Sequence, residues 1–128
     1  MALRVLIVDD NANFLEVARD LLEREGLAVV GIASTSAEAL QRARELQPEV
    51  ILVDVDLGEE SGFDLAQQLA ASEVGRIVLV SAYPEADFAD LIGTSPAVGF
   101  VSKSQLSAAA IAGVIGNRGN GGAIKAAD

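Results

Sequence analysis

The chain has 128 residues, 51% of them hydrophobic and 22% charged, so it is long and apolar enough to bury the core of one domain. It contains neither cysteine nor histidine, which excludes zinc sites built on thiolates or imidazoles, cysteine nucleophiles and catalytic triads with a histidine base. Its 19 acidic and 9 basic residues give a net charge of −10, which disfavours phosphate backbones and anionic membranes as partners.

The chain begins with a short apolar strand followed by an amphipathic helix. Residues 5–8 are continuous Val, Leu and Ile, as in a strand buried on both faces, and they lead directly into Asp9 and Asp10. Apolar side chains then recur at helical spacing over residues 14–22, and Gly26 ends the predicted helix.

The alternation continues through the middle of the chain. Residues 28–33 predict a second strand, and Thr35 with Glu38 three residues later forms a capping-box pattern that begins a second helix. Pro48 ends that helix, and residues 50–55 predict a third strand.

The second half adds a helix, a strand, a weaker helix, a strand and a last helix. In chain order they are predicted at residues 62–71, 77–80, 84–92, 98–101 and 104–115. The helices carry start signals: Ser61 with Asp64 three residues later, Pro84 in the first turn, and Ser104 as a cap.

Five strand–helix units in succession predict an α/β fold. We expect a doubly wound, five-stranded parallel sheet of strand order 2-1-3-4-5, covered by helices on both faces in a flavodoxin-like three-layer sandwich. Residues 1–116 are predicted to form this single domain. Residues 117–128, rich in Gly, Asn and Ala, are predicted to be a flexible tail or the stub of a linker.

Acidic residues stand where the first and third strands end. Asp9 and Asp10 follow the first strand, and Asp54 and Asp56 follow the third. In the expected strand order these strands are neighbours, and ligands bind outside the carboxyl ends of such strands. We therefore expect Asp9, Asp10 and Asp54 to share one pocket. Mg²⁺ prefers oxygen ligands and would keep all three carboxylates ionised, so it is the predicted cofactor.

Two further polar residues are expected at the same edge of the sheet. Ser81 follows the fourth strand and Lys103 follows the fifth. A hydroxyl group and an ammonium group there would bind the oxygens of a phosphoryl group carried by Asp54. The combined set suits acyl-phosphate chemistry.

Taken together, these residues resemble the receiver domain of bacterial two-component response regulators. The resemblance covers residues 4 to about 116 and rests on motifs at four strand ends: Asp9-Asp10, Asp54, Ser81-Ala82, and Phe100 with Lys103. It implies a signalling domain rather than an enzyme. Asp54 would accept a phosphoryl group from the phosphohistidine of a sensor kinase or a phosphotransfer protein.

The resemblance also implies the metal ligands. Asp10 would bind Mg²⁺ directly, Asp9 would act through a water molecule, Asp54 would bind directly, and Asp56 would contribute its backbone carbonyl.

The remaining matched residues would form the switch. Ser81 and Lys103 would contact the phosphoryl oxygens, and Phe100 would swing inward when Ser81 moves. Phosphorylation would then select a pre-existing active arrangement.

The sequence departs from the family pattern at three positions. Ser104 replaces the usual proline after the lysine, Gly58 replaces a common proline in the loop after Asp54 and should loosen it, and the switch hydroxyl is serine rather than threonine. Asp56 and Tyr83 occupy two variable positions that tune the lifetime of the aspartyl phosphate in this family. We expect phosphorylation to survive these departures.

Two classes of enzyme use similar acids. Asp54 and Asp56 also resemble the nucleophile and acid of haloacid-dehalogenase-like phosphatases, although in those enzymes the pair follows the first strand; this Mg-dependent phosphatase is the alternative function. Nucleic-acid enzymes of the topoisomerase-primase type would need a glutamate where Asp9 and Asp10 stand.

The expected partners are therefore proteins: a sensor histidine kinase or phosphotransfer protein, and a second copy in a homodimer formed through the fourth helix, fifth strand and fifth helix. We expect no direct binding of nucleic acid and no membrane association. The first apolar run is too short for a signal peptide, which predicts a cytoplasmic location.

Overall fold

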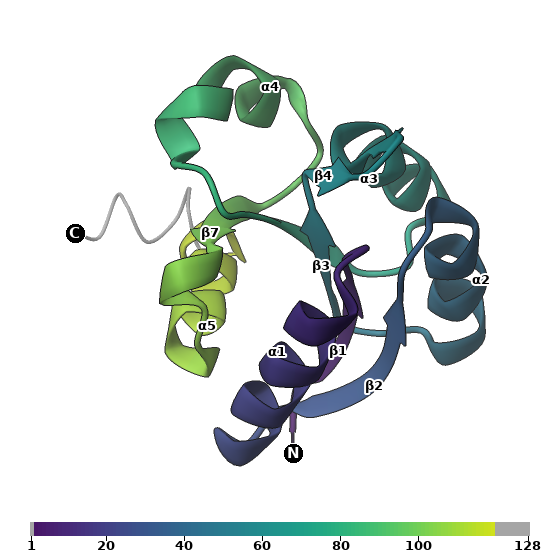
Figure 1. The fold of residues 1–128 in the computed structure, drawn as a ribbon, viewed down its shortest axis with the longest axis vertical. Helices are drawn as coiled ribbons and strands as arrows, with labels where there is room; N and C mark the ends of the chain where they lie inside the picture. Colours follow the sequence, from purple (N-terminus) through teal and green to yellow (C-terminus); the bar gives the residue numbers. More distant parts are fainter. Residues whose placement is uncertain (1, 120–128) are drawn as a thin grey trace.

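The computed structural model describes the backbone of residues 2–119 and the side chains of residues 2–116. Five parallel strands form one sheet in the order β2-β1-β3-β6-β7, which is 2-1-3-4-5 in chain order and confirms the prediction (Figure 1). The strands are β1 (Arg4–Val8), β2 (Ala28–Ala33), β3 (Val50–Asp54), β6 (Arg76–Ser81) and β7 (Gly99–Ser102).

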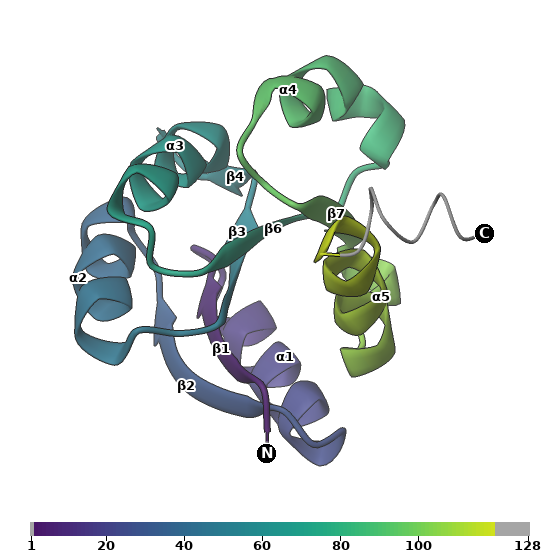
Figure 2. The same ribbon diagram turned by 180° about the vertical axis from the view of Figure 1, so that it is seen from behind.

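Helices cover both faces of this sheet. The helices α1 (Ala12–Arg24) and α5 (Ala108–Gly119) lie on one face, and α2 (Ser36–Leu46) and α3 (Gly62–Ser72) lie on the other (Figures 1 and 2). The short helix α4 (Ala89–Thr94) follows a 3₁₀ turn, η1 (Glu85–Phe88), on the same face as α3.

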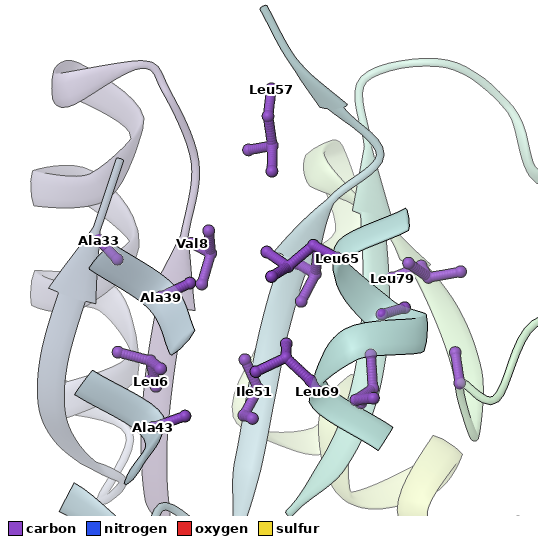
Figure 3. Close-up of a cluster of buried hydrophobic side chains, with 14 of the residues drawn as sticks. Leu6, Val8, Ala33, Ala39, Ala43, Ile51, Leu57, Leu65, Leu69 and Leu79 are labelled. Carbon is purple, nitrogen blue, oxygen red and sulfur yellow. The ribbon is translucent and has the colours of Figure 1, made fainter. Parts of the chain in front are cut away.

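The two cores follow from strand alternation, because successive side chains of a strand point to opposite faces. In β1, Val5 and Ile7 belong to the cluster under α1 and α5, whereas Leu6 and Val8 belong to the cluster under α2 and α3. Figure 3 shows the second cluster, in which leucines of α3 and alanines of α2 meet the strands. A sheet buried on both faces explains the uninterrupted Val, Leu and Ile of its central strands.

The predicted helix starts at Thr35 and Ser61 are confirmed. Thr35 Oγ1 accepts a hydrogen bond from the Glu38 N–H at 3.1 Å, and Ser61 Oγ accepts one from the Phe63 N–H at 3.1 Å. Gly26 follows α1 with φ +97°, a backbone conformation that favours glycine. These local signals fix where the helices turn back to the sheet.

The last two helices differ from prediction. The weaker helix predicted over residues 84–92 is divided into η1 and α4, neither of which buries a residue fully. The last helix begins at Ala108 rather than after Ser104, because the Ser107 hydroxyl caps it through the Ala110 N–H at 2.9 Å. Ser104 lies in a 3₁₀ turn, η2 (Lys103–Gln105), and its hydroxyl bonds that of Ser102 at 2.9 Å.

The end of the last helix also differs. Its backbone continues past Ile115 to Gly119, so the first residues of the predicted tail are helical. The remainder of that tail, residues 120–128, lies outside the described residues. Among the described helices, none combines the length and the apolar character needed to cross a bilayer.

The loop after β3 is a small hairpin that sequence reasoning did not predict. The strands β4 (Asp56–Leu57) and β5 (Glu60–Ser61) pair in an antiparallel arrangement. Gly58, with φ +75°, makes the turn between them. The hairpin leads directly from the end of β3 to the start of α3.

Candidate functional site

The register of the sheet brings three carboxylates together. Val8 at the end of β1 pairs with Val53 of β3, so Asp9 and Asp54 occupy neighbouring positions at the carboxyl edge. Carboxylate oxygens of Asp9, Asp10 and Asp54 lie within 4.8 Å of one another. The pocket expected from the strand ends is therefore present, and we call these three residues the acidic triad.

The three acids differ in their surroundings. Asp9 is 1% exposed and Asp54 is 5% exposed, whereas Asp10 lies in solvent. The Asn11 N–H donates to Asp9 Oδ1 at 2.9 Å, and the Asp56 N–H approaches Asp54 Oδ1 at 3.3 Å. Backbone donors thus orient the two buried carboxylates and leave one oxygen of each directed into the pocket.

Lys103 approaches the triad from η2, immediately after β7. Its Nζ lies 2.7 Å from Asp9 Oδ2 and 3.5 Å from Asp54 Oδ2, and its side chain is 20% exposed. The contact with Asp9 has the distance of an ion pair but not the direction of a hydrogen bond, since Asp9 Oδ2 receives no hydrogen bond. The predicted convergence of Lys103 on the acids is observed, with Asp9 as its nearer partner.

Burial and like charge make Asp54 unusually basic. Burial raises its pKa, the neighbouring Asp9 charge raises it further, and Lys103 only partly opposes them, so the pKa of Asp54 reaches about 6. For Lys103, burial works against the charged form, but Asp9 and Asp54 outweigh it and raise its pKa. Lys103 therefore stays charged, and the ionised form of Asp54 is disfavoured relative to that of an exposed aspartate.

The residues present fit a hard divalent cation. All donors of the triad are carboxylate oxygens, which suit Mg²⁺, and Asp10 keeps the pocket open to water, which Mg²⁺ retains. Asp9 Oδ2 is buried and forms an ion pair with Lys103 Nζ at 2.7 Å, but it accepts no well-directed hydrogen bond. A cation there would offset the repulsion that raises the pKa of Asp54.

Ser81 lies at the same edge, as predicted. It is the last residue of β6, is 1% exposed, and follows Val80, which pairs with Asp54. Its hydroxyl oxygen accepts a hydrogen bond from the Tyr83 N–H at 3.0 Å, which leaves the hydroxyl proton for another acceptor.

Three other sequence candidates lie outside the acidic triad. Phe100 of β7 is half-buried, with its ring centroid 6.3 Å from that of Phe88. The Asp56 side chain is exposed and accepts a hydrogen bond from the Gly58 N–H at 3.2 Å. Tyr83 is 61% exposed.

Two residues of the site were not found from the sequence. Phe14 was assigned only to the apolar stripe of α1, but its ring centroid lies 4.3 Å from Lys103 Nζ. Gly62 packs against the backbone carbonyl of Asp54, where no side chain would fit. The available signal for Phe14 was its position one helical turn after Asp10.

Curated proteins match most of this chain. A putative transcriptional regulator of Pseudomonas aeruginosa is 36% identical over 103 residues, which cover 80% of this chain and 50% of that protein. The response regulator GacA of Pseudomonas viridiflava is 34% identical over 103 residues, covering 79% and 48%. The chain thus spans about half the length of these curated relatives.

Solved structures share the fold. A two-component response regulator of the LuxR family from Aurantimonas is 26% identical with a TM-score of 0.80, covering 94% of this chain and 87% of that one. A response regulator from Burkholderia pseudomallei, with a phosphorylated aspartic acid, a calcium ion and citrate, is 29% identical with a TM-score of 0.79, covering 97% and 73%. The model of the response regulator receiver domain matches residues 5–113, and the chain therefore belongs to that family.

Proposed function

We propose that this domain accepts a phosphoryl group on Asp54 from the phosphohistidine of a sensor kinase or phosphotransfer protein, and signals through the change in shape that follows. The observation that carries the proposal is the position of Asp54 at a strand end, among two other acids and 3.5 Å from Lys103. The relative from Burkholderia that carries a phosphorylated aspartic acid supports it.

The reaction is a phosphoryl transfer between two nucleophiles. An Asp54 carboxylate oxygen forms a bond to phosphorus while the phosphorus–nitrogen bond of phosphohistidine breaks, and the imidazole leaves with the bonding electrons and takes up a proton. With a small acyl phosphate the breaking bond is phosphorus–oxygen, and the carboxylate leaves. In both cases the product is a mixed anhydride on Asp54.

The residues around Asp54 serve this transfer by charge and position. Asp9, Asp10, Asp54 and the backbone carbonyl of Asp56 would hold Mg²⁺, which would supply positive charge to the transferring oxygens. Lys103, whose Nζ lies 3.5 Å from Asp54 Oδ2, supplies a second positive charge. Because the transferred group is highly charged, placing these cations beforehand lowers the barrier.

The switch would use the residues next to the phosphoryl group. Ser81 donates its free proton to a phosphoryl oxygen, and Phe100 follows the shift of Ser81. Phe100 already packs against Phe88 of η1, so its movement is transmitted to η1 and α4. The face of α4, β7 and α5 is the proposed contact surface for protein partners, including a second copy.

The phosphatase alternative has less support. That chemistry needs Asp56 as an acid beside Asp54, but the Asp56 carboxylate is exposed, bonds to the Gly58 N–H, and is not part of the triad. The proposed domain is therefore a phosphoacceptor of a cytoplasmic two-component system, without turnover of a separate substrate.

The test is the intact mass of the protein after incubation with Mg²⁺ and acetyl phosphate. We expect a gain of one phosphoryl group, no gain with EDTA, and no gain in Asp54→Asn. The matched control is Asp64→Asn, which removes an exposed acid of α3 and keeps the gain. An unmodified wild-type protein, or an Asp54→Asn variant modified as fast as the wild type, contradicts the proposal. Catalytic release of phosphate from p-nitrophenyl phosphate would instead support the phosphatase.

A further inference from the structure

The ammonium group of Lys103 has a third neighbour besides its two carboxylates. The ring of Phe14 lies with its centroid 4.3 Å from Lys103 Nζ. A cation within about 6 Å of an aromatic ring face is attracted by the negative face of the ring. The ammonium is therefore enclosed by Asp9, Asp54 and Phe14, and only 20% of the side chain remains exposed.

The backbone around Lys103 gives this side chain little support. Lys103 begins η2, whose closing hydrogen bond, from the Leu106 N–H to the Lys103 carbonyl, is long at 3.4 Å. Ser104, where the family usually has proline, is exposed and bonds only locally with Ser102. A lysine side chain has four flexible carbons, so a weakly held turn alone does not fix the position of its nitrogen.

Phe14, in contrast, is held firmly in the first turn of α1. Its N–H donates to the capping side chain of Asn11 at 3.1 Å, and the Asn11 N–H donates to Asp9 Oδ1 at 2.9 Å. The Phe14 side chain is half-buried against the core cluster under α1 and α5. The Phe14 backbone is thus linked by two hydrogen bonds to the segment that carries Asp9 and Asp10, and core packing places its ring.

We propose that Phe14 is a positioning residue for phosphoryl transfer: its ring face holds the Lys103 ammonium beside Asp54. This contact compensates for the absence of the proline that usually follows the lysine, where this chain has Ser104. The inference rests on the proposed phosphorylation of Asp54. The ring attracts the ammonium without neutralising it, so Lys103 keeps its full charge for the incoming phosphoryl group. A third carboxylate in place of the ring would hold the ammonium more tightly, but it would compete with the phosphoryl oxygens.

The first measurement reports the contact itself. Phe14→Leu removes the ring face, whereas Phe14→Tyr keeps it. The chain has only two lysines, so lysine labelling gives two sets of NMR signals, and Lys125→Arg assigns them. We expect the ε-methylene protons of Lys103 to be shifted upfield by the ring in the wild type and in Phe14→Tyr, and to lose that shift in Phe14→Leu.

The second measurement is the rate of phosphorylation by acetyl phosphate at saturating Mg²⁺. We expect a fall of about 3- to 10-fold in Phe14→Leu, little change in Phe14→Tyr, and unchanged Mg²⁺ affinity in both. Leu27→Ala truncates a half-buried side chain packed on the same core cluster as Phe14, at the opposite edge of the sheet from the site, and controls for general loosening of the fold.

The outcomes separate the two proposals. An unshifted Lys103 signal in the wild type, or a Phe14→Leu variant phosphorylated as fast as the wild type, overturns the role of Phe14. An equal loss of rate in Leu27→Ala overturns it as well, because the effect is then one of stability. A wild type that gains no phosphoryl group overturns the proposed function and the role of Phe14 together, whereas in every other case phosphorylation itself is intact.

Discussion

At Asp54, the features that suit the proposed phosphoryl transfer lower the stability of the folded protein. Its carboxylate is 5% exposed and lies beside that of Asp9, so its ionised form is disfavoured in the folded protein. Burial first and the Asp9 charge second raise the pKa of Asp54 from 3.8 to about 6. Folding alone would not select such a group, because burying an incompletely paired charge is costly. The proposed role of Asp54 as a nucleophile beside bound cations accounts for it.

This raised pKa predicts how stability depends on pH when Mg²⁺ is absent. The folded pKa of about 6 exceeds the unfolded value of 3.8, so between these values the folded state binds more protons than the unfolded state. The Asp54 contribution to the free energy of unfolding therefore falls as pH rises through this window. By pH 7 it reaches about 1 to 3 kcal/mol of destabilisation.

Asp54→Asn removes this contribution and is expected to be more stable than the wild type at pH 7. At pH 4 the two proteins should have similar free energies of unfolding, since Asp54 is then largely protonated in the folded state. Urea titrations in EDTA at both values measure the difference. Adding Mg²⁺ at pH 7 should stabilise only the wild type and so reduce the difference in the free energy of unfolding between the two proteins. Equal stability of the two proteins at pH 7 in EDTA would contradict a raised pKa of Asp54 in the folded protein.

At the scale of elements, the main architecture could be predicted because local signals agree with the tertiary fold. Continuous apolar strands, the Thr35 and Ser61 caps and Gly26 gave the order of strands and helices. Strand order then placed the three acids of the triad together without further information. This part of the site depends only on strand ends, which sequence patterns locate well.

The elements that were predicted poorly lack one clear local signal. The α4 region has no fully buried residue, so core packing does not enforce one continuous helix and it divides into η1 and α4. Ser104 and Ser107 could each cap the start of α5. Ser104 lies in the turn that begins with Lys103, so the helix begins after Ser107. The contact of Phe14 with Lys103 joins segments remote in sequence, which periodicity cannot show.

The junction between β3 and α3 gives a prediction at this scale. Gly62 is buried at the start of α3, its N–H bonds the Val55 carbonyl at 3.0 Å, and a Cβ at this position would collide with the Asp54 carbonyl oxygen. Gly62→Ala must therefore move α3 away from the strand end. We expect a loss of about 1 to 3 kcal/mol in the free energy of unfolding. Phosphorylation of Asp54 should also slow.

The matched control is Gly113→Ala in α5, where a Cβ would meet nothing within 4 Å. Alanine is the better helix former, so this variant should be unchanged or more stable by up to about 1 kcal/mol. The free energies of unfolding of both variants are measured by chemical denaturation, and their phosphorylation rates are measured with acetyl phosphate. If Gly62→Ala behaved like Gly113→Ala, the close packing of α3 against the Asp54 carbonyl would have no energetic role.

At the scale of the whole molecule, charge is the dominant unbalanced feature. The net charge of −10 is spread over a chain with only two lysines, and the acidic triad adds a local concentration of negative charge at one edge of the sheet. Long-range repulsion between these charges favours the unfolded state, whose charges lie further apart. Diffuse repulsion and local repulsion should respond differently to salt and to Mg²⁺.

Diffuse repulsion is screened by any salt, because the screening length falls from about 30 Å at 0.01 M ionic strength to about 10 Å at 0.1 M. We expect NaCl over this range to raise the free energy of unfolding by on the order of 1 kcal/mol in the wild type and in Asp54→Asn alike. MgCl₂ at the same ionic strength should stabilise the wild type further, because it also binds the triad, and should do less in Asp54→Asn. Urea midpoints in the two salts separate the contributions. If MgCl₂ and NaCl were equivalent at matched ionic strength, the triad would not bind the cation, and the acids at this edge would act only as part of the general negative charge.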